Sequence, residues 1–221
     1  ETGARFLLDP RRKHRPSLLE DAPADRSRRI DFYRRCVDLA AELGAGVVSL
    51  WAGSSPAAVL GTLDVDPDHV LGDRLIEGLV PVLAHAEGAG VRVALEPEPG
   101  MFVERPIGFE TLVARGGAAL DDLGLTLDVG HCVVTGDEPV SHVAERLSSR
   151  LVHVHLADCP RGRHEHLPFG EGDLDLAEAL DGLTRAGFAG IGAVELSRDG
   201  HRGPDAAREA MDAVRRALAD S

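Results

Sequence analysis

The stretch LGLTLDVGHCVVTGDEPVSHVAERLSSRLVHVHLAD, residues 123–158, decides the fold of this chain. Two short runs rich in Leu and Val, at 123–128 and 151–156, flank a segment with helical patterning over about 138–148. Short apolar runs separated by a helix are typical of buried parallel strands in β-α-β units. Asp128 ends the first run and His155 lies near the end of the second, and neither is easily buried without a partner. The stretch therefore predicts a parallel sheet with polar groups at the carboxyl ends of its strands.

The same pattern recurs on both sides of this stretch. VRVALEPEPG at 91–100 carries Glu96, and IGAVELS at 191–197 carries Glu195. The four strand ends thus offer three carboxylates and one imidazole, a ligand set that suits a hard or borderline divalent metal ion. We expect Glu96, Asp128, His155 and Glu195 to bind one divalent ion, Mn, Mg, Co or Zn.

Alternation along the strands supports this ligand set, because every second side chain of a strand points to the same face. Polar residues fall on one face of three consecutive strands and apolar residues on the other. His153 shares its face with a predicted ligand but lies one layer deeper, so we expect it to be a hydrogen-bonded core histidine. The pairs that share the inward face are Thr126 with Asp128, His153 with His155, and Ala193 with Glu195.

Glu98 competes with Glu96 for the ligand position at 91–100. The two prolines in LEPEPG limit regular strand pairing, so the inward phase is not defined beyond Pro97. Glu96 continues the apolar strand in phase and is therefore the preferred ligand, and Glu98 is the alternative.

Helix and strand patterns alternate through the rest of the chain and predict a single α/β domain over residues 1–221. The first helix is expected over 27–44, with Ser27 as a candidate N-cap and Gly44 as its stop. A strand stub is considered at residues 1–6. The other expected elements are strands at 47–53, 91–96 and 191–196 and helices at about 70–88, 107–120, 174–186 and 204–219.

Five strands fall short of the eight that close a (β/α)8 TIM barrel. The chain also begins at ETGARF without Met. We therefore expect a TIM barrel that lacks its first βα units in this chain. An open doubly wound sheet, with ligands at the carboxyl ends of its strands, is the alternative.

Composition restricts the partners. A formal net charge of -13 argues against a protein that binds nucleic acid through the phosphate backbone. No apolar run reaches the length of a membrane span. The three cysteines show no Cys-x-x-Cys spacing, which favours a reducing cytoplasm over a disulfide framework. Small neutral or anionic substrates held through a metal, and a homo-oligomer, are compatible with these properties.

The loop CPRGRHEHLPFGEGDLD at 159–175 follows a predicted ligand strand and is rich in Arg, His and Gly. Arg161, Arg163, His164 and His166 are therefore candidates to contact a hydroxylated or anionic substrate, with a solvated surface loop as the alternative. The basic run RRKHR at 11–15 is expected to be a solvated loop, although in a complete barrel it would lie near the rim of the active site.

Five short motifs fall between about residue 91 and residue 196. They are Leu-Glu-Pro at 95–97, Asp-x-x-His at 128–131, His-x-His-Leu-x-Asp at 153–158, His-Leu-Pro-x-Gly-Glu-Gly at 166–172 and Val-Glu-Leu at 194–196. Together they resemble the xylose-isomerase-like barrels, which include sugar-phosphate isomerases and epimerases, ketohexose epimerases and apurinic endonucleases.

The resemblance implies that Glu96, Asp128, His155 and Glu195 bind the catalytic metal. It also implies that His131 contacts the substrate or a second metal, and that His166 lies beside the pocket. In the epimerases of this family, two glutamates, here Glu96 and Glu195, bind the metal and also move protons through an enediolate.

We therefore expect a metal-dependent isomerase or epimerase of a sugar or sugar phosphate, with Glu96 and Glu195 catalytic and His131, Arg161 and His166 binding substrate. Two alternatives stay open: a metal-dependent lyase, dehydratase or hydrolase on the same frame, and a non-catalytic binding protein. The endonucleases carry Asp-x-His where this chain has His164-Glu165-His166, which argues against DNA repair.

Overall fold

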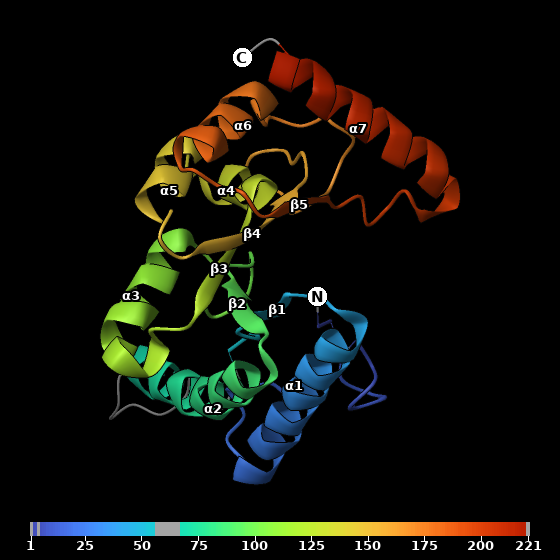
Figure 1. Cartoon of the computed structure of the whole chain (residues 1–221). Helices are drawn as coiled ribbons and strands as arrows, with labels where there is room; N and C mark the ends of the chain where they lie inside the picture. The colour runs from blue at the N-terminus through green and yellow to red at the C-terminus, as the bar shows by residue number, and fades with distance from the viewer. Residues whose placement is uncertain (1, 4, 56–66, 220–221) are drawn as a thin grey trace. The chain divides into compact units, whose positions relative to one another are not determined.

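The computed structural model describes the whole chain except residues 1, 4, 56–66 and 220–221 (Figure 1). The chain divides into two compact units, Glu1–Gly124 and Leu125–Ser221. Helices and strands alternate in both units, as the sequence predicts. The prediction that residues 1–221 form one domain stays a prediction.

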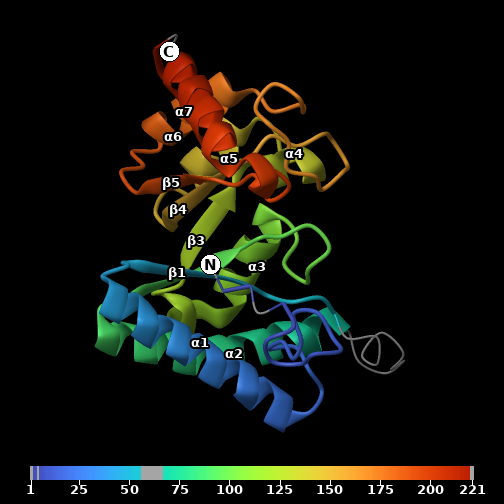
Figure 2. The ribbon, with the colours of Figure 1, turned by 90° about the vertical axis from the view of Figure 1, so that its right-hand side faces the viewer.

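In the first unit, β1 and β2 pair in parallel, with Val47 opposite Arg92 and Trp51 opposite Glu96. The helices α1 and α2 lie side by side and pack on these strands (Figures 1 and 2). Leu50 and Leu95 are fully buried in the resulting core. The elements of this unit are α1 Pro23–Leu43, β1 Val47–Trp51, α2 Pro67–Ala89, β2 Arg92–Glu96, α3 Pro106–Gly116 and the 3-10 helix η2 Gly117–Leu120.

In the second unit, β3, β4 and β5 pair in parallel, and Leu127 and Val154 are buried among them. The helix α6 packs between α5 and α7 (Figure 1). The elements are β3 Gly124–Asp128, α4 Val129–Thr135, α5 Val140–Arg146, β4 Leu151–Leu156, α6 Leu176–Arg185, β5 Ile191–Val194, the 3-10 helix η3 Gly200–Arg202 and α7 Gly203–Ala219.

The start of the first helix was predicted wrongly. Helix α1 begins at Pro23, with Ala22 as N-cap, and Ser27 lies inside the helix. Proline fits the first helical turn because its missing N–H would have no intrahelical partner there. The C-terminal stop is confirmed, since Gly44 adopts a left-handed φ of 70° and its N–H donates to Ala41.

Two further differences concern short segments. Helix α4 begins directly after β3 and was not predicted, because Asp128 ends the strand and also caps the helix. The stub at residues 1–6 shows no strand in the positions that the structure describes there.

Five parallel strands are found in the described part of the chain, against eight in a closed barrel. Strand β5 pairs with β4 on one side and with no other strand of the described residues on its outer side. Its first residue, Ile191, is accordingly 73% exposed. None of the described helices combines the length and the hydrophobicity that crossing a membrane requires.

Candidate metal centre and substrate site

Asp128 is the buried carboxylate at the end of β3. Its Oδ1 accepts hydrogen bonds from the backbone N–H groups of Gly130 at 2.7 Å and His131 at 3.1 Å, which cap α4. Its Oδ2 is also buried but has no hydrogen-bond partner among the described residues. A buried carboxylate oxygen without a donor is destabilising, so this atom is suited to accept a cation.

Strand register brings two further predicted ligands to Asp128. His155 on β4 lies directly opposite Asp128 in the parallel ladder, and Ala193 on β5 lies opposite His155. Glu195 follows β5 by one residue, and its N–H donates to Leu156 at 3.0 Å, which extends the ladder. One ligand atom from each of Asp128, His155 and Glu195 lies within 4.8 Å of the others.

The protonation of the two carboxylates reflects this crowding. Burial raises the pKa of Asp128 from its ordinary value of 3.8 to about 6, and the imidazoles of His166 and His155 offset only part of this effect. Burial also opposes ionisation of Glu195, but His166 and His155 outweigh it and lower the pKa of Glu195 below its usual value. At neutral pH the site thus holds carboxylates that gain from a nearby cation.

A second cluster consists of three histidines. The Nε2 of His131 lies 3.0 Å from the Nε2 of His164, which lies 3.2 Å from the Nε2 of His166. The other ring nitrogen of His166, Nδ1, lies 3.3 Å from Oε1 of Glu195. The histidine cluster therefore adjoins the carboxylates through a histidine that faces both.

The spacing within both clusters fits metal binding. Two ligand atoms about 2.1 Å from one ion at a tetrahedral angle lie about 3.4 Å apart. The Nδ1 of His155 lies 3.5 Å from Oε2 of Glu195, and the Nε2 separations in the histidine cluster are similar. Partial burial of the His164 ring, and then its two imidazole neighbours, lower its pKa to about 4, so it is neutral at pH 7, as a metal ligand must be.

The loop that carries the histidines is held by Asp158. Its carboxylate accepts hydrogen bonds from the N–H groups of Gly170, Gly172 and Leu174, at 2.7, 3.0 and 3.0 Å. A Cβ added at Gly172 would lie 2.2 Å from Oδ1 of Asp158, so the loop needs glycine at this position. Asp158 therefore caps this loop through its carboxylate.

Arg161 stands apart from both clusters. Its guanidinium forms two hydrogen bonds with Glu138, at 2.8 and 2.9 Å, and a further ion pair with Asp173 at 3.3 Å. The side chain is 60% exposed. Its predicted contact with substrate stays a prediction, since these carboxylates already engage its donors.

Glu96 lies in the first unit, as the last residue of β2, and is 1% exposed. Its Oε2 accepts a hydrogen bond at 3.2 Å from the indole Nε1 of Trp51, the opposite residue on β1. Glu98 lies beyond the strand in a turn, where its N–H donates to Val103 at 3.0 Å and its side chain is half-buried. Glu96 thus ends its strand in a buried position, and its preference over Glu98 as the metal ligand stays a prediction.

His153 is half-buried, and its ring lies edge-on to His155 at 5.0 Å between centroids. Burial and then His155 lower its pKa to about 4, so it is neutral. This agrees with its expected role as a core histidine.

Two contacts were not found from the sequence. His164 was a candidate only for substrate contact, yet it completes the histidine cluster with a residue 33 positions away. The bond from Trp51 to Glu96 joins residues 45 positions apart. The spacing His164-x-His166 was the one signal for the first contact, and no local pattern points to the second.

Comparison with known proteins places the chain in a family. A family model described as Xylose isomerase-like TIM barrel matches residues 8–217. An uncharacterized protein of Methanocaldococcus jannaschii, MJ1311, is 24% identical over 98% of this chain and 77% of its own length.

Two relatives carry functional names. Fructoselysine 3-epimerase of Shigella flexneri is 27% identical over 76% of this chain, which spans 58% of that protein. Inosose dehydratase of Lacticaseibacillus casei is 26% identical over 58% of this chain, and the match covers 44% of that protein.

Two solved structures share the fold. A D-tagatose 3-epimerase-like protein superimposes with a TM-score of 0.75 at 24% identity, over 92% of this chain and 76% of that one. The IOLI protein, whose structure contains a zinc atom, gives a TM-score of 0.70 at 20% identity, over 92% of this chain and 72% of that one. The predicted TIM-barrel class is therefore confirmed.

Proposed function

Because the chain belongs to the xylose isomerase-like TIM barrel family, which matches residues 8–217, we propose that it is a metal-dependent isomerase or epimerase of a sugar or sugar phosphate. The single observation that carries the proposal is that one ligand atom each of Asp128, His155 and Glu195 lies within 4.8 Å of the others, while the buried Oδ2 of Asp128 has no hydrogen bond among the described residues. A fructoselysine epimerase and an epimerase-like structure among its relatives support the reaction class.

The proposed ion is Mn, Mg, Co or Zn, held by Asp128, His155 and Glu195, with Glu96 as the fourth ligand. Glu96 is included because it is the buried last residue of its strand, as Asp128 is. The zinc in the IOLI structure supports a metal in this family. When bound, the ion would withdraw electron density from the carbonyl and hydroxyl oxygens of the substrate and so make the adjacent C–H more acidic.

The proton transfer is assigned to Glu96 and Glu195. The pKa of Glu195 is held below its usual value, so this carboxylate is ionised at neutral pH and can accept the proton of the carbon beside the carbonyl. An enediolate results, and the second glutamate returns a proton to one of its carbons. Which carbon and which face receive the proton decides between isomerisation and epimerisation.

The histidines and Arg161 are assigned to the substrate. His131 and His166 present ring nitrogens beside Glu195, where a sugar hydroxyl could donate to or accept from them. The proposed partner is therefore a small carbohydrate. A cytoplasmic location and a homo-oligomer stay predictions from the sequence.

Proton exchange with solvent tests the proposal. The chain is incubated with each metal in deuterated water and a panel of ketoses, aldoses and their phosphates, and loss of the proton beside the carbonyl is followed by NMR. Exchange should require the metal and be lost in Glu195→Gln, which keeps the side-chain shape but removes the base. Turnover of the panel without exchange would contradict the proton-transfer mechanism.

A dehydratase is the second candidate, favoured by the inosose dehydratase relative. In this reaction the same proton is removed, the β-hydroxyl then leaves as water, and the dehydrated ketone is the product. The two reactions separate in the same experiment, because dehydration releases an unsaturated ketone that absorbs in the ultraviolet and epimerisation does not.

A further inference from the structure

Arg29, on α1, is a buried cation without a carboxylate partner. Its side chain is 4% exposed, and its Nε donates to the carbonyl of Pro16 at 2.7 Å while Nη2 donates to the carbonyl of His14. Within the described residues it forms no ion pair, and the nearby Asp25 pairs with Arg28 instead at 3.6 Å. The guanidinium carbon also lies 5.4 Å from the ring centroid of Phe32 and 5.1 Å from that of Tyr33. These contacts leave the buried charge without a counter-anion among the described residues, so its surroundings favour an anionic ligand.

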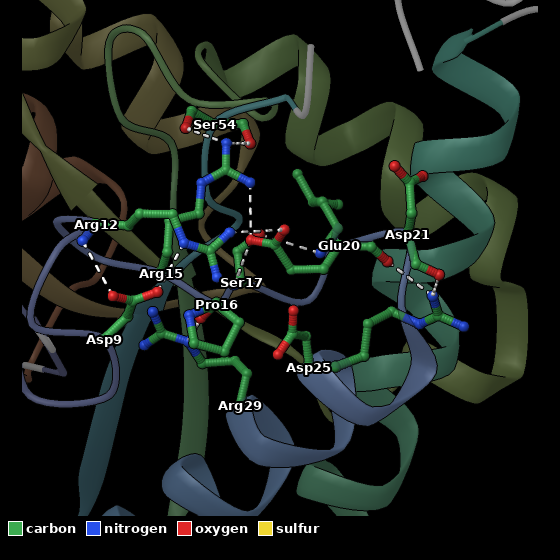
Figure 3. A network of polar contacts seen from close by, with 12 residues as sticks. Asp9, Arg12, Arg15, Pro16, Ser17, Glu20, Asp21, Asp25, Arg29 and Ser54 are labelled. Atoms are coloured by element: carbon green, nitrogen blue, oxygen red, sulfur yellow. Dashed lines mark hydrogen bonds and ion pairs between the residues drawn. The ribbon is translucent and has the colours of Figure 1, made fainter. Parts of the chain in front are cut away.

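The loop that covers Arg29 is built rigidly by its own polar contacts (Figure 3). Arg15 donates to Glu20 at 2.7 Å, and Glu20 in turn accepts the N–H of Ser17 at 3.1 Å. Gly53 permits the close approach of this loop to the end of β1, since a Cβ there would lie 2.6 Å from Cβ of Ser17. The first three residues of the basic run at 11–15 are exposed, as expected of a solvated loop, and His14 and Arg15 are half-buried against the rest of the unit.

Between this loop and the end of β1 lies a cavity of about 70 Å³. Among the described residues, Glu20 is the only carboxylate that forms an ion pair with a cation of the cavity lining, and that cation is Arg15. Lys13 and Arg29 form no ion pair with the described residues. The remaining basic group, His14, has its pKa lowered by burial and then by Lys13. The lining includes Lys13, His14, Arg15, Arg29, Trp51 and Ser54.

The cavity shares Trp51 with the proposed site. His14 and Trp51 both line the cavity, and their rings lie edge-on with 4.9 Å between centroids. The indole Nε1 of Trp51 donates a hydrogen bond to Glu96. A group held in the cavity is therefore one side chain away from a proposed proton carrier. Two unpaired cations and a serine hydroxyl match a compact dianion that accepts several hydrogen bonds.

We propose that this cavity binds the phosphate group of a phosphorylated sugar. This inference rests on the proposed function and narrows its substrate to sugar phosphates. Lys13 contributes an exposed ammonium, and Arg29 contributes a guanidinium already held by two carbonyls, so the cavity needs little rearrangement to receive the anion.

Trp51 provides the assay, because it is the only tryptophan of the chain. The full chain is titrated with inorganic phosphate at constant ionic strength, with a chelator present so that no metal ion can bind the phosphate, and tryptophan fluorescence is recorded. Saturable binding is expected. Lys13→Gln should weaken it about tenfold, as expected for the loss of one charge-assisted hydrogen bond.

Arg11→Gln is the matched control, since Arg11 is an exposed cation of the same loop but does not line the cavity. Its phosphate affinity should change less than about twofold. Arg29→Lys tests the buried charge, and if that variant fails to fold, Lys13→Gln still decides. No saturable response to phosphate, or equal weakening in Lys13→Gln and Arg11→Gln, would overturn the inference.

The outcome is separable from that of the proposed function. Proton exchange with unphosphorylated sugars alone, without phosphate binding, would leave the isomerase or epimerase in place and remove the phosphate subsite. Phosphate binding that depends on Lys13, without exchange on any sugar, would keep the subsite and remove the proposed reaction.

Discussion

The substitution Asp128→Asn should stabilise the metal-free protein at alkaline pH while removing metal binding. Asparagine keeps the Oδ1 that accepts from Gly130 and His131 to cap α4, but it cannot carry the buried charge. Burial raises the pKa of Asp128 from 3.8 to about 6 in the folded chain. Because the pKa of Asp128 is higher in the folded state than in the unfolded state, its protonated form favours folding. This stabilisation is fully present below about pH 4 and is lost as the pH rises through about 6.

The difference between the two pKa values corresponds to about 3 kcal/mol of unfolding free energy at a pH well above 6. Metal-free Asp128→Asn should therefore be more stable than the parent by up to about 3 kcal/mol near pH 8 and nearly equal to it near pH 4. Urea unfolding in the presence of a chelator, followed by circular dichroism, measures both values.

Adding a divalent ion should reverse the order. An ion at about one hundred times its dissociation constant stabilises a protein that binds it by about 2.7 kcal/mol, and the variant should gain little. Two results would refute the argument that the buried charge of Asp128 is destabilising without a cation. One is a metal-free variant that is less stable than the parent near pH 8. The other is a variant whose free energy of unfolding rises as much as that of the parent when the ion is added.

Three further predictions concern other residues. Glu96→Gln should weaken divalent-ion binding by about 10-fold or more, and Glu98→Gln should change it little, which a competition titration with a metal indicator can measure. His166→Ala should raise KM more than it lowers kcat, and it should move the acid limb of the pH-rate profile to higher pH, because the His166 imidazole helps to lower the pKa of Glu195. Gly172→Ala should destabilise the chain by about 2 kcal/mol in urea unfolding, since its Cβ would meet Asp158 at 2.2 Å. Gly88→Ala, inside helix α2 with nothing within 4 Å, is the control and should stabilise the chain by up to about 1 kcal/mol, because alanine is the better helix former.

The strands and their ends were predictable because the pattern that defines them is local. Strand β4 runs over Leu151–Leu156 as expected, and the phase that places His155 and Asp128 on one face needs only alternation along each strand. The prediction missed helix α4 because one residue has two structural roles there. Asp128 both ends β3 and caps α4, so the helix that follows was hidden behind the strand.

Hydrogen bonds between segments that are far apart in the chain could not be predicted from the sequence, for a physical reason. The backbone carbonyls that accept hydrogen bonds from Arg29 belong to residues 13 and 15 positions earlier in the chain. A backbone acceptor does not depend on the type of residue that carries it. Every residue has a carbonyl, so neither composition nor spacing could predict this bond.

Both candidate sites lie where the fold leaves a charge or a polar atom unpaired. Asp128 Oδ2 lacks a donor among the described residues, and Arg29 lacks a carboxylate there. Each arrangement is unfavourable for folding by itself, and hydrophobic side chains of similar size would avoid it. A cation at the first and an anion at the second would remove both penalties. The two sites therefore call for ligands of opposite charge, a metal ion at the first and a phosphate at the second.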